Sequence, residues 1–145
     1  MYGKEKIMSN YAKNELSKRN KYYISKDRYL ELKHFCLQYK EWRDEYNAID
    51  NYPSRNIEIL SDYAGISKDS FVEKQAIKAA ELSKRMKLVK DVARATDEYL
   101  GDYIFKAVTE DLSFTYLSTK LSIPCGRDMY YDRYRRFFWL MDKER

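Results

Sequence analysis

The sequence has few of the residues that interrupt regular structure. Only four Gly and two Pro occur in 145 residues, and 44% of the residues are hydrophobic. Because glycine and proline are the main breakers of helices, their scarcity favours long regular elements and argues against a disordered chain. At this length we expect one compact body of ordinary domain size.

Cysteine and histidine are also scarce. The two cysteines, Cys36 and Cys125, lie far apart, and His34 is the single histidine. Neither cysteine belongs to a CxxC or Cys/His pattern, so the sequence predicts neither a disulfide scaffold nor a zinc site. Because no P-loop, GxGxxG, HExxH or nucleophile elbow occurs either, we expect no catalytic residues, no cofactor and no metal.

A third scarcity is that of long hydrophobic runs. The sequence offers no stretch of about 18 apolar residues that could span a bilayer. Its N-terminus also lacks the apolar core of a signal peptide. We therefore expect a cytoplasmic protein that has no membrane partner.

Basic residues and tyrosine, by contrast, are abundant. Lys and Arg number 28 against 23 Asp and Glu, which gives a net charge of +5, and 15 residues are Tyr. A positive charge suits a polyanionic partner, whereas tyrosine serves cores, interfaces and stacking surfaces equally well. The basic excess is strong in residues 1–24, which we expect to form a basic mobile arm.

Apolar residues at three- and four-residue steps predict a first long helix. Ser25 is a candidate N-cap, and the apolar stripe after it runs from Tyr29 to Ile49. The helix should end before Pro53, because proline forces the preceding residue out of the helical region. Residues 55–68 show little periodicity and are expected to form a loop with a short helical turn at most.

A second long helix is predicted from Ser70 onwards. Ser70 and Glu73 match a capping box, and a second apolar stripe runs from Val72 to Ala93. The two stripes favour a hairpin of two long antiparallel helices over residues 25–95. The seam-like spacing of the second stripe also fits a coiled-coil dimer, so both a monomer and a homodimer remain open.

Residues 96–145 are expected to form a C-terminal helical lobe. Thr96 or Asp97 can cap a third helix, and Ser113 can cap a short fourth one. Pro124 then interrupts the apolar pattern, and a last helix should run from Arg127 to about residue 141. A short helix, a tight turn and a longer basic helix are the parts of a helix-turn-helix. The predicted fold class is therefore all-α, with two long antiparallel helices and a C-terminal helix-turn-helix lobe.

The predicted last helix is rich in groups that bind DNA. Arginine donates in a fork that suits guanine edges and phosphates, and tyrosine can bond a phosphate or touch a thymine methyl group. We therefore expect the DNA-binding residues to be Lys120, Arg127, Tyr130, Tyr131, Arg133, Arg135 and Arg136.

A simpler interpretation of the same residues remains open. The arginines of the last helix would then be solvated residues of an ordinary surface helix, paired with Asp128 and Asp132. The cluster of Phe137, Phe138 and Trp139 is likewise more typical of a core than of a stacking platform.

The C-terminal sequence also resembles a known family. Residues 123–140, IPCGRDMYYDRYRRFFWL, look like the C-terminus of small phage and prophage transcriptional regulators of the RinA/ArpU late-regulator type. Those proteins resemble region 4 of sigma factors in this part. Residues 22–29 and 32–36 also look like prophage proteins from Gram-positive bacteria. The interval from Ile123 to Met129 is longer than is usual in a helix-turn-helix.

This resemblance implies sequence-specific binding to double-stranded DNA near a phage promoter. It further implies activation of late genes through host RNA polymerase, in the cytoplasm of a bacterial host cell. By the same resemblance, three positions would be buried in the helix-turn-helix, Leu117, Leu121 and Ile123. Five would face DNA: Arg127, Tyr130, Tyr131, Arg133 and Arg136.

Two other functions remain as alternatives. A small terminase-like packaging protein would also be helical and would bind DNA, but it should assemble as a ring. A protein-only interaction module would use the tyrosine-rich surface and would show no affinity for DNA.

Overall fold

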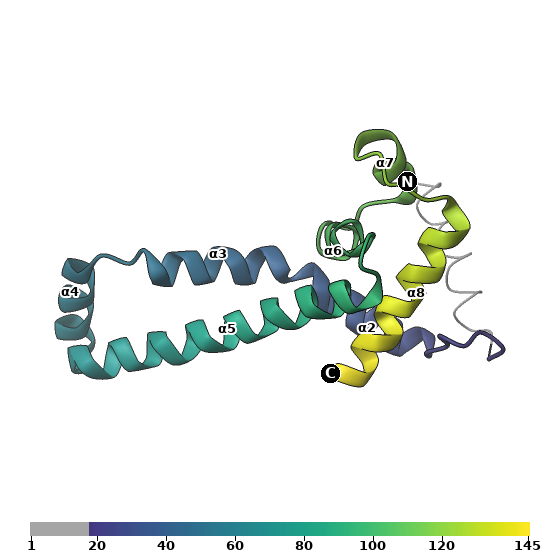
Figure 1. Ribbon diagram of the computed structural model, residues 1–145. Helices are drawn as coiled ribbons and strands as arrows, with labels where there is room; N and C mark the ends of the chain where they lie inside the picture. The colour runs from purple at the N-terminus through teal and green to yellow at the C-terminus, as the bar shows by residue number, and fades with distance from the viewer. Residues whose placement is uncertain (1–17) are drawn as a thin grey trace. The chain divides into compact units, whose positions relative to one another are not determined.

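The computed structural model describes residues 18–145, and all regular elements among them are α-helices (Figure 1). In chain order these are α2 (Lys26–Leu37), α3 (Tyr39–Asp50), α4 (Ser54–Ala64), α5 (Lys68–Thr96), α6 (Gly101–Glu110), α7 (Phe114–Lys120) and α8 (Arg127–Glu144). The all-α prediction is thus confirmed for this part of the chain. Among residues 18–145, no helix combines the length and the apolar character needed to cross a bilayer.

The chain divides into two compact units at points other than those expected from the sequence. Unit 1 contains the described residues 18–37 together with 89–145, and unit 2 contains residues 38–88. Helix α5 contributes its first part to unit 2 and its last turns to unit 1. The N-terminal helix α2 therefore belongs with the C-terminal lobe and not with a hairpin over residues 25–95.

The predicted single helix over residues 25–49 is in fact two helices. Helix α2 ends at Leu37 and α3 begins at Tyr39, and the two belong to different units. Gln38 between them keeps near-helical backbone angles, with φ −78° and ψ −5°. Apolar residues continue at helical spacing across the break, and no proline or glycine marks it. Periodicity therefore could not reveal it.

Unit 2 is a short antiparallel hairpin of α3 and the first part of α5, joined by α4 (Figure 1). The Lys78 Nζ lies 3.4 Å from the Glu45 carboxylate, and the rings of Tyr52 and Phe71 are 6.2 Å apart. From the first contact to the second, the residue number rises from 45 to 52 on the α3 side and falls from 78 to 71 on α5, as in an antiparallel pair. The antiparallel pairing therefore exists, but over a much shorter length than predicted.

The prediction of a loop over residues 55–68 was wrong, because most of this segment is the helix α4. Pro53 precedes the helix with φ −65° in an extended conformation, which suits a helix start. Gly65 ends it with φ 70°, and the Ile66 N–H donates to the Ser61 carbonyl oxygen. This is the glycine-terminated helix end that satisfies the last carbonyl groups.

Helix α5 begins before the predicted capping box. It starts at Lys68, and the Ser67 Oγ accepts a hydrogen bond of 3.1 Å from the Ser70 N–H. Ser67 therefore caps the helix, and the prediction that Ser70 and Glu73 do so was wrong. The candidate cap at Ser25 is confirmed, since its Oγ accepts from the Arg28 N–H at 3.2 Å.

The core of unit 1 forms where α2, α6 and α8 pack on one another and on the last turns of α5. Helix α6 passes close to α5, because a Cβ atom at Gly101 would lie 3.0 Å from the Ala93 carbonyl oxygen. A side chain here would press on the backbone of α5, so the close approach favours glycine. The side chains with no more than 2% exposure include Leu32, Val89, Leu100, Ile104, Leu117, Tyr130, Phe137, Phe138 and Met141.

Aromatic rings form much of this core. The Phe138 ring lies 5.0 Å from each of the rings of Tyr29, Tyr134 and Phe137, in edge-on geometries. Edge-to-face pairs at this separation are favourable beyond the area that they bury. The interpretation of Phe137 and Phe138 as core residues is therefore confirmed. Trp139 is half-buried, with its ring 5.5 Å from that of Tyr22.

The expected mobile arm lies only partly within the described residues, since residues 1–17 fall outside them. The last part of the arm is packed against unit 1: Tyr22 is 9% exposed and Ile24 is 5% exposed. The Tyr22 N–H donates to the Asn20 Oδ1 at 2.9 Å. For these residues the prediction of a mobile segment was wrong, because their apolar side chains are buried.

Replacing Phe138 with alanine should unfold unit 1 readily. The ring is fully buried among three aromatic neighbours, and Phe-to-Ala changes in cores cost about 3–5 kcal/mol. Urea denaturation followed by circular dichroism will measure this loss. The matched control is Tyr99→Ala, an aromatic truncation at a residue that is 81% exposed, which should change stability by less than about 0.5 kcal/mol. Equal effects of the two changes would contradict this description of the core.

Candidate nucleic-acid interface

Helix α7 begins at the predicted cap. The Ser113 Oγ accepts a hydrogen bond of 3.2 Å from the Tyr116 N–H, and α7 then runs for seven residues. Phe114 and Leu117 are buried and hold the helix onto unit 1. Because both lie on one side of so short a helix, the other side faces solvent.

The turn between α7 and α8 is held by backbone hydrogen bonds. Ser122 adopts the left-handed conformation with φ 53°, and the Ile123 N–H donates to the Leu117 carbonyl oxygen at 3.0 Å. Ile123 itself is 7% exposed, as predicted for the buried aliphatic residue of the turn. The Cys125 N–H then donates to the Ile123 carbonyl oxygen, and α8 begins at Arg127. The predicted start of the last helix is thus confirmed.

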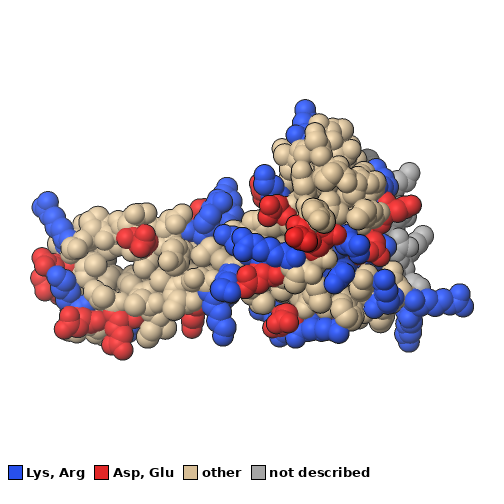
Figure 2. Space-filling view, viewed as in Figure 1, with Lys and Arg blue, Asp and Glu red and all other residues tan. Residues whose placement is uncertain are grey.

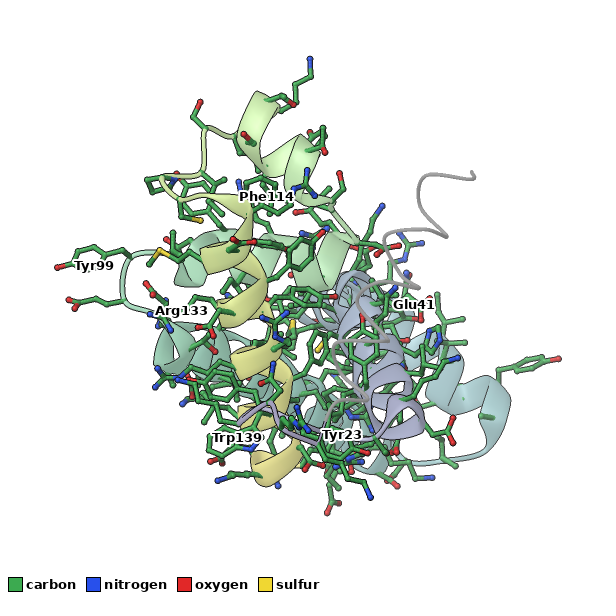
Figure 3. The ribbon with its side chains drawn as sticks, turned by 90° about the vertical axis from the view of Figure 1, so that its right-hand side faces the viewer. Tyr23, Glu41, Tyr99, Phe114, Arg133 and Trp139 are labelled. Carbon is green, nitrogen blue, oxygen red and sulfur yellow. The ribbon has the colours of Figure 1, made fainter. Side chains whose placement is uncertain are left out.

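Solvent reaches the outer side of α7 and the first turn of α8. We call this surface the α7–α8 edge; its exposed residues are Thr115, Tyr116, Ser118, Thr119, Lys120, Arg127, Asp128 and Met129. The Arg127 guanidinium lies 5.1 Å from the centre of the Phe114 ring, which Figure 3 labels at this end of unit 1. Of the expected DNA-binding residues, Lys120 and Arg127 are therefore the two that are exposed.

Tyr130 is not available to contact DNA. It is 2% exposed, and its ring lies 5.4 Å from Phe114 and 5.8 Å from Tyr134. Burial raises the pKa of its hydroxyl above the usual value of 10.0. The expectation for Tyr130 was wrong, because the ring fills the core beside α7. Tyr131 is half-buried, and its ring lies 5.1 Å from that of Tyr130.

Arg133 is held in ion pairs within unit 1. Its Nε donates to the Asp97 Oδ2 at 2.9 Å, and its Nη1 donates to the Asp132 Oδ2 at the same distance. Asp97 lies between α5 and α6, so this contact fastens α8 to the start of α6. Figure 3 shows Arg133 on the side of α8 that faces the turn carrying Tyr99. The role that the structure gives to Arg133 is structural support.

Asp97 is the partner that makes this contact strong. Its Oδ1 accepts hydrogen bonds of 2.8 Å from the N–H groups of Tyr99 and Leu100. Partial burial alone would raise the pKa of this carboxyl, but these N–H groups and the Arg133 guanidinium outweigh burial and lower it. Asp97 thus caps the turn that precedes α6, whereas the N-cap of α6 itself is Leu100, which has no side-chain cap. The prediction that Thr96 or Asp97 caps this helix was wrong.

Arg135 and Arg136 are half-buried on α8. The Arg135 Nε is buried and has no hydrogen-bond partner within residues 18–145. From Tyr130 to Asp142, all residues of α8 are buried or half-buried. This degree of burial fits neither a long protruding recognition helix nor an ordinary solvated surface helix.

A second concentration of positive charge joins the last part of the predicted basic arm to the end of α8, and the sequence did not predict that these two segments meet. The Lys143 Nζ lies 3.5 Å above the Trp139 ring, which contacts Tyr22, and the Lys21 Nζ lies 5.0 Å from the Tyr22 ring. We call this region the basic end; its exposed cations are Lys18, Arg19, Lys21, Lys26, Lys143 and Arg145. Figure 2 shows Lys and Arg gathered there, whereas the surface over α7 is mostly uncharged. No local pattern joins these residues, because their contacts span more than one hundred positions.

Other features of unit 1 offer little chemistry. Within residues 18–145, no group of His, Cys, Asp and Glu side chains is arranged to hold a metal ion. Burial raises the pKa of the Cys36 thiol to about 12, so this thiol is unreactive at neutral pH. A cleft of about 440 Å³ is lined by Asp102, Tyr103, Phe105, Lys106 and Leu121.

Comparisons with protein-family models, with curated proteins and with solved structures find no match to this chain.

Replacing Asp97 with asparagine should lower stability in a pH-dependent way. The folded-state pKa of this carboxyl lies below its unfolded value of about 3.9, so the ion pair stabilises the protein above that pH. Its contribution is lost as the pH falls through the folded-state pKa. We expect a loss of about 1–3 kcal/mol at pH 7, because Asn cannot pair with the Arg133 charge.

The measurement is urea denaturation of the wild-type and Asp97→Asn proteins between pH 7 and pH 3. The difference between them should shrink towards the acid end, since the unfolded wild-type chain takes up a proton on this carboxyl there before the folded protein does. A difference that stays constant over this range would contradict the assigned role. Asp102→Asn is a suitable control, because Asp102 is exposed on α6.

Proposed function

We propose that this protein is a double-stranded DNA-binding transcriptional regulator, and that unit 1 contacts the duplex through the α7–α8 edge. The observation that carries the proposal is the exposure of Lys120 and Arg127 beside three hydroxyl side chains, Thr115, Ser118 and Thr119. Phosphates and base edges are bound by such cations and hydroxyl groups.

The start of α8 supports the same surface. The first N–H groups of a helix lack partners within it, and the helix dipole makes this end positive. Gly126 precedes the helix and provides no side-chain hydrogen bond to these groups. A phosphate at this position would receive backbone hydrogen bonds as well as the Arg127 charge.

The contact set differs from that expected from the sequence. Lys120 and Arg127 are assigned direct contacts, whereas Tyr130 and Arg133 support the fold. Because the residues of α8 from Tyr130 to Asp142 are buried or half-buried, we assign the readout of bases to its first turn and to the end of α7. Helix-turn-helix proteins use the N-terminal residues of the second helix in this way.

The distribution of charge supports unit 1 as the part that binds DNA. Residues 18–37 and 89–145 contain 16 Lys and Arg against 12 Asp and Glu, a net charge of +4. Residues 38–88 contain nine of each, a net charge of zero. Attraction to the duplex over distances of about 10 Å should therefore act on unit 1.

The regulatory part of the proposal rests on the resemblance of residues 123–140 to phage and prophage late regulators. On this basis the protein would act at a promoter in a bacterial cell and would activate late genes together with host RNA polymerase. A packaging protein and a protein-only interaction module are the competing functions, and both are distinguished by the experiment below.

Replacing Arg127 with alanine should weaken DNA binding by about 1–3 kcal/mol if its guanidinium reads a base. Lys120→Ala should weaken binding to all sequences alike and lower the salt slope by about one, since it removes one phosphate contact. The matched controls are Arg55→Ala and Lys74→Ala, which remove the same charges from exposed positions of unit 2.

Fluorescence anisotropy on DNA fragments selected by the purified protein will measure these effects at several salt concentrations. If the unit 2 variants weaken binding as much as the unit 1 variants, the α7–α8 edge is not the binding surface. Absence of DNA binding at low salt would favour a protein-only module, and a ring-shaped oligomer would favour packaging.

A further inference from the structure

Helix α5 has an uncovered side in unit 2. Its residues recur at helical spacing and are all exposed, and we call this side the outer face of α5. The residues are Asp69, Val72, Glu73, Ala76, Ala80, Ser83, Lys84 and Lys87. Val72 is 45% exposed, and Ile77 at the margin of the face is 56% exposed.

This face contains part of the apolar seam found in the sequence. The later part of the seam is buried in unit 1, where Val89 is 0% and Ala93 is 1% exposed. The earlier part divides, because Leu82 is buried in unit 2 while Val72 and Ala76 face solvent. Part of the apolar seam of α5 is therefore left uncovered by the other helices of this chain.

Unit 2 has a thin core of its own. Among its apolar side chains, only Tyr39, Trp42 and Leu82 are buried. Units of this size usually need a disulfide, a metal site or oligomerisation to be stable. Both cysteines lie in unit 1, and no metal-binding group occurs among residues 18–145. Association with another chain would add to its stability.

The charges on the outer face of α5 indicate that the associating chain is a second copy of this one. Asp69 and Glu73 lie at the start of this face, and Lys84 and Lys87 lie at its end. From Asp69 to Lys87 the helix advances 18 positions, or about 27 Å. A two-fold axis at position 78 sets residue 69 opposite 87, 72 opposite 84, 73 opposite 83 and 76 opposite 80. Each acidic end then meets a basic end.

We propose that two copies of this chain associate through the outer faces of α5, which pair in antiparallel orientation. Ala76 and Ala80 meet at the centre, and their small side chains permit the axes to approach within about 8–10 Å. Glu73 of one copy lies within a helical turn of Lys84 of the other, and this pair occurs twice by symmetry. A parallel pairing would instead set like charges against each other.

Charge exchange at residues 73 and 84 tests the pairing. We will measure the dimer dissociation constant of the full chain by sedimentation equilibrium. Glu73→Lys and Lys84→Glu should each raise it about tenfold or more, because two attractive pairs become repulsive. The double variant E73K/K84E should restore it to near the wild-type value. Asp62→Lys on α4 is the control, since it changes the charge of unit 2 at an exposed residue outside the outer face of α5.

Cross-linking tests the orientation, in a Cys125→Ser background that leaves only the buried Cys36. A mixture of Ala76→Cys and Ala80→Cys chains should form disulfide-linked dimers under mild oxidation, and each variant alone should form few. A wild-type protein that stays monomeric at about 100 μM would overturn the proposal. The proposal would also be overturned if the dissociation constant of E73K/K84E were as high as those of the single variants, or if either cysteine variant alone cross-linked efficiently.

Discussion

The burial of α8 is the constraint on which unit 1 depends. One side of this helix places Phe137, Phe138 and Met141 in the core at 0% exposure, against α2 and α6. A helix that provides so much of a core cannot also present its length to a ligand. Exposed residues of α8 lie only at its two ends, from Arg127 to Met129 and at Lys143 and Glu144. The core therefore sets the size and position of any binding surface that α8 can form.

The Asp97–Arg133 pair shows how charge serves this packing. The Asp97 carboxylate caps a turn with one oxygen and receives the Arg133 guanidinium with the other. With the carboxylate side chain 12% and the guanidinium side chain 26% exposed, removing either partner would leave a partly buried charge without its counter-charge. An arginine in a basic, aromatic helix thus positions that helix, while the cations that suit a polyanion lie elsewhere on unit 1.

The sequence predicts features that depend on neighbouring residues and misses those that depend on contacts between distant residues. The caps at Ser25 and Ser113 were predicted because a cap is local chemistry between neighbours. The break at Gln38 was missed, because it depends on which unit each side of an unbroken apolar stripe joins. The contact of Tyr22 with Trp139 was missed for a related reason, since tertiary packing alone brings them together. For the candidate site, the sequence located the short helix and turn but not the direction of the α8 side chains.

The division into two units separates two kinds of surface. Unit 1 carries the excess positive charge, whereas unit 2 is neutral and bears an uncovered helix face with opposite charges at its two ends. If two chains pair through unit 2, two-fold symmetry relates their two copies of unit 1, the part that we propose binds DNA, whatever the distance between them. Two α7–α8 edges related by two-fold symmetry would match a DNA site made of two inverted half-sites. Because each α7–α8 edge offers few direct contacts, binding two half-sites at once would supply affinity that one edge lacks.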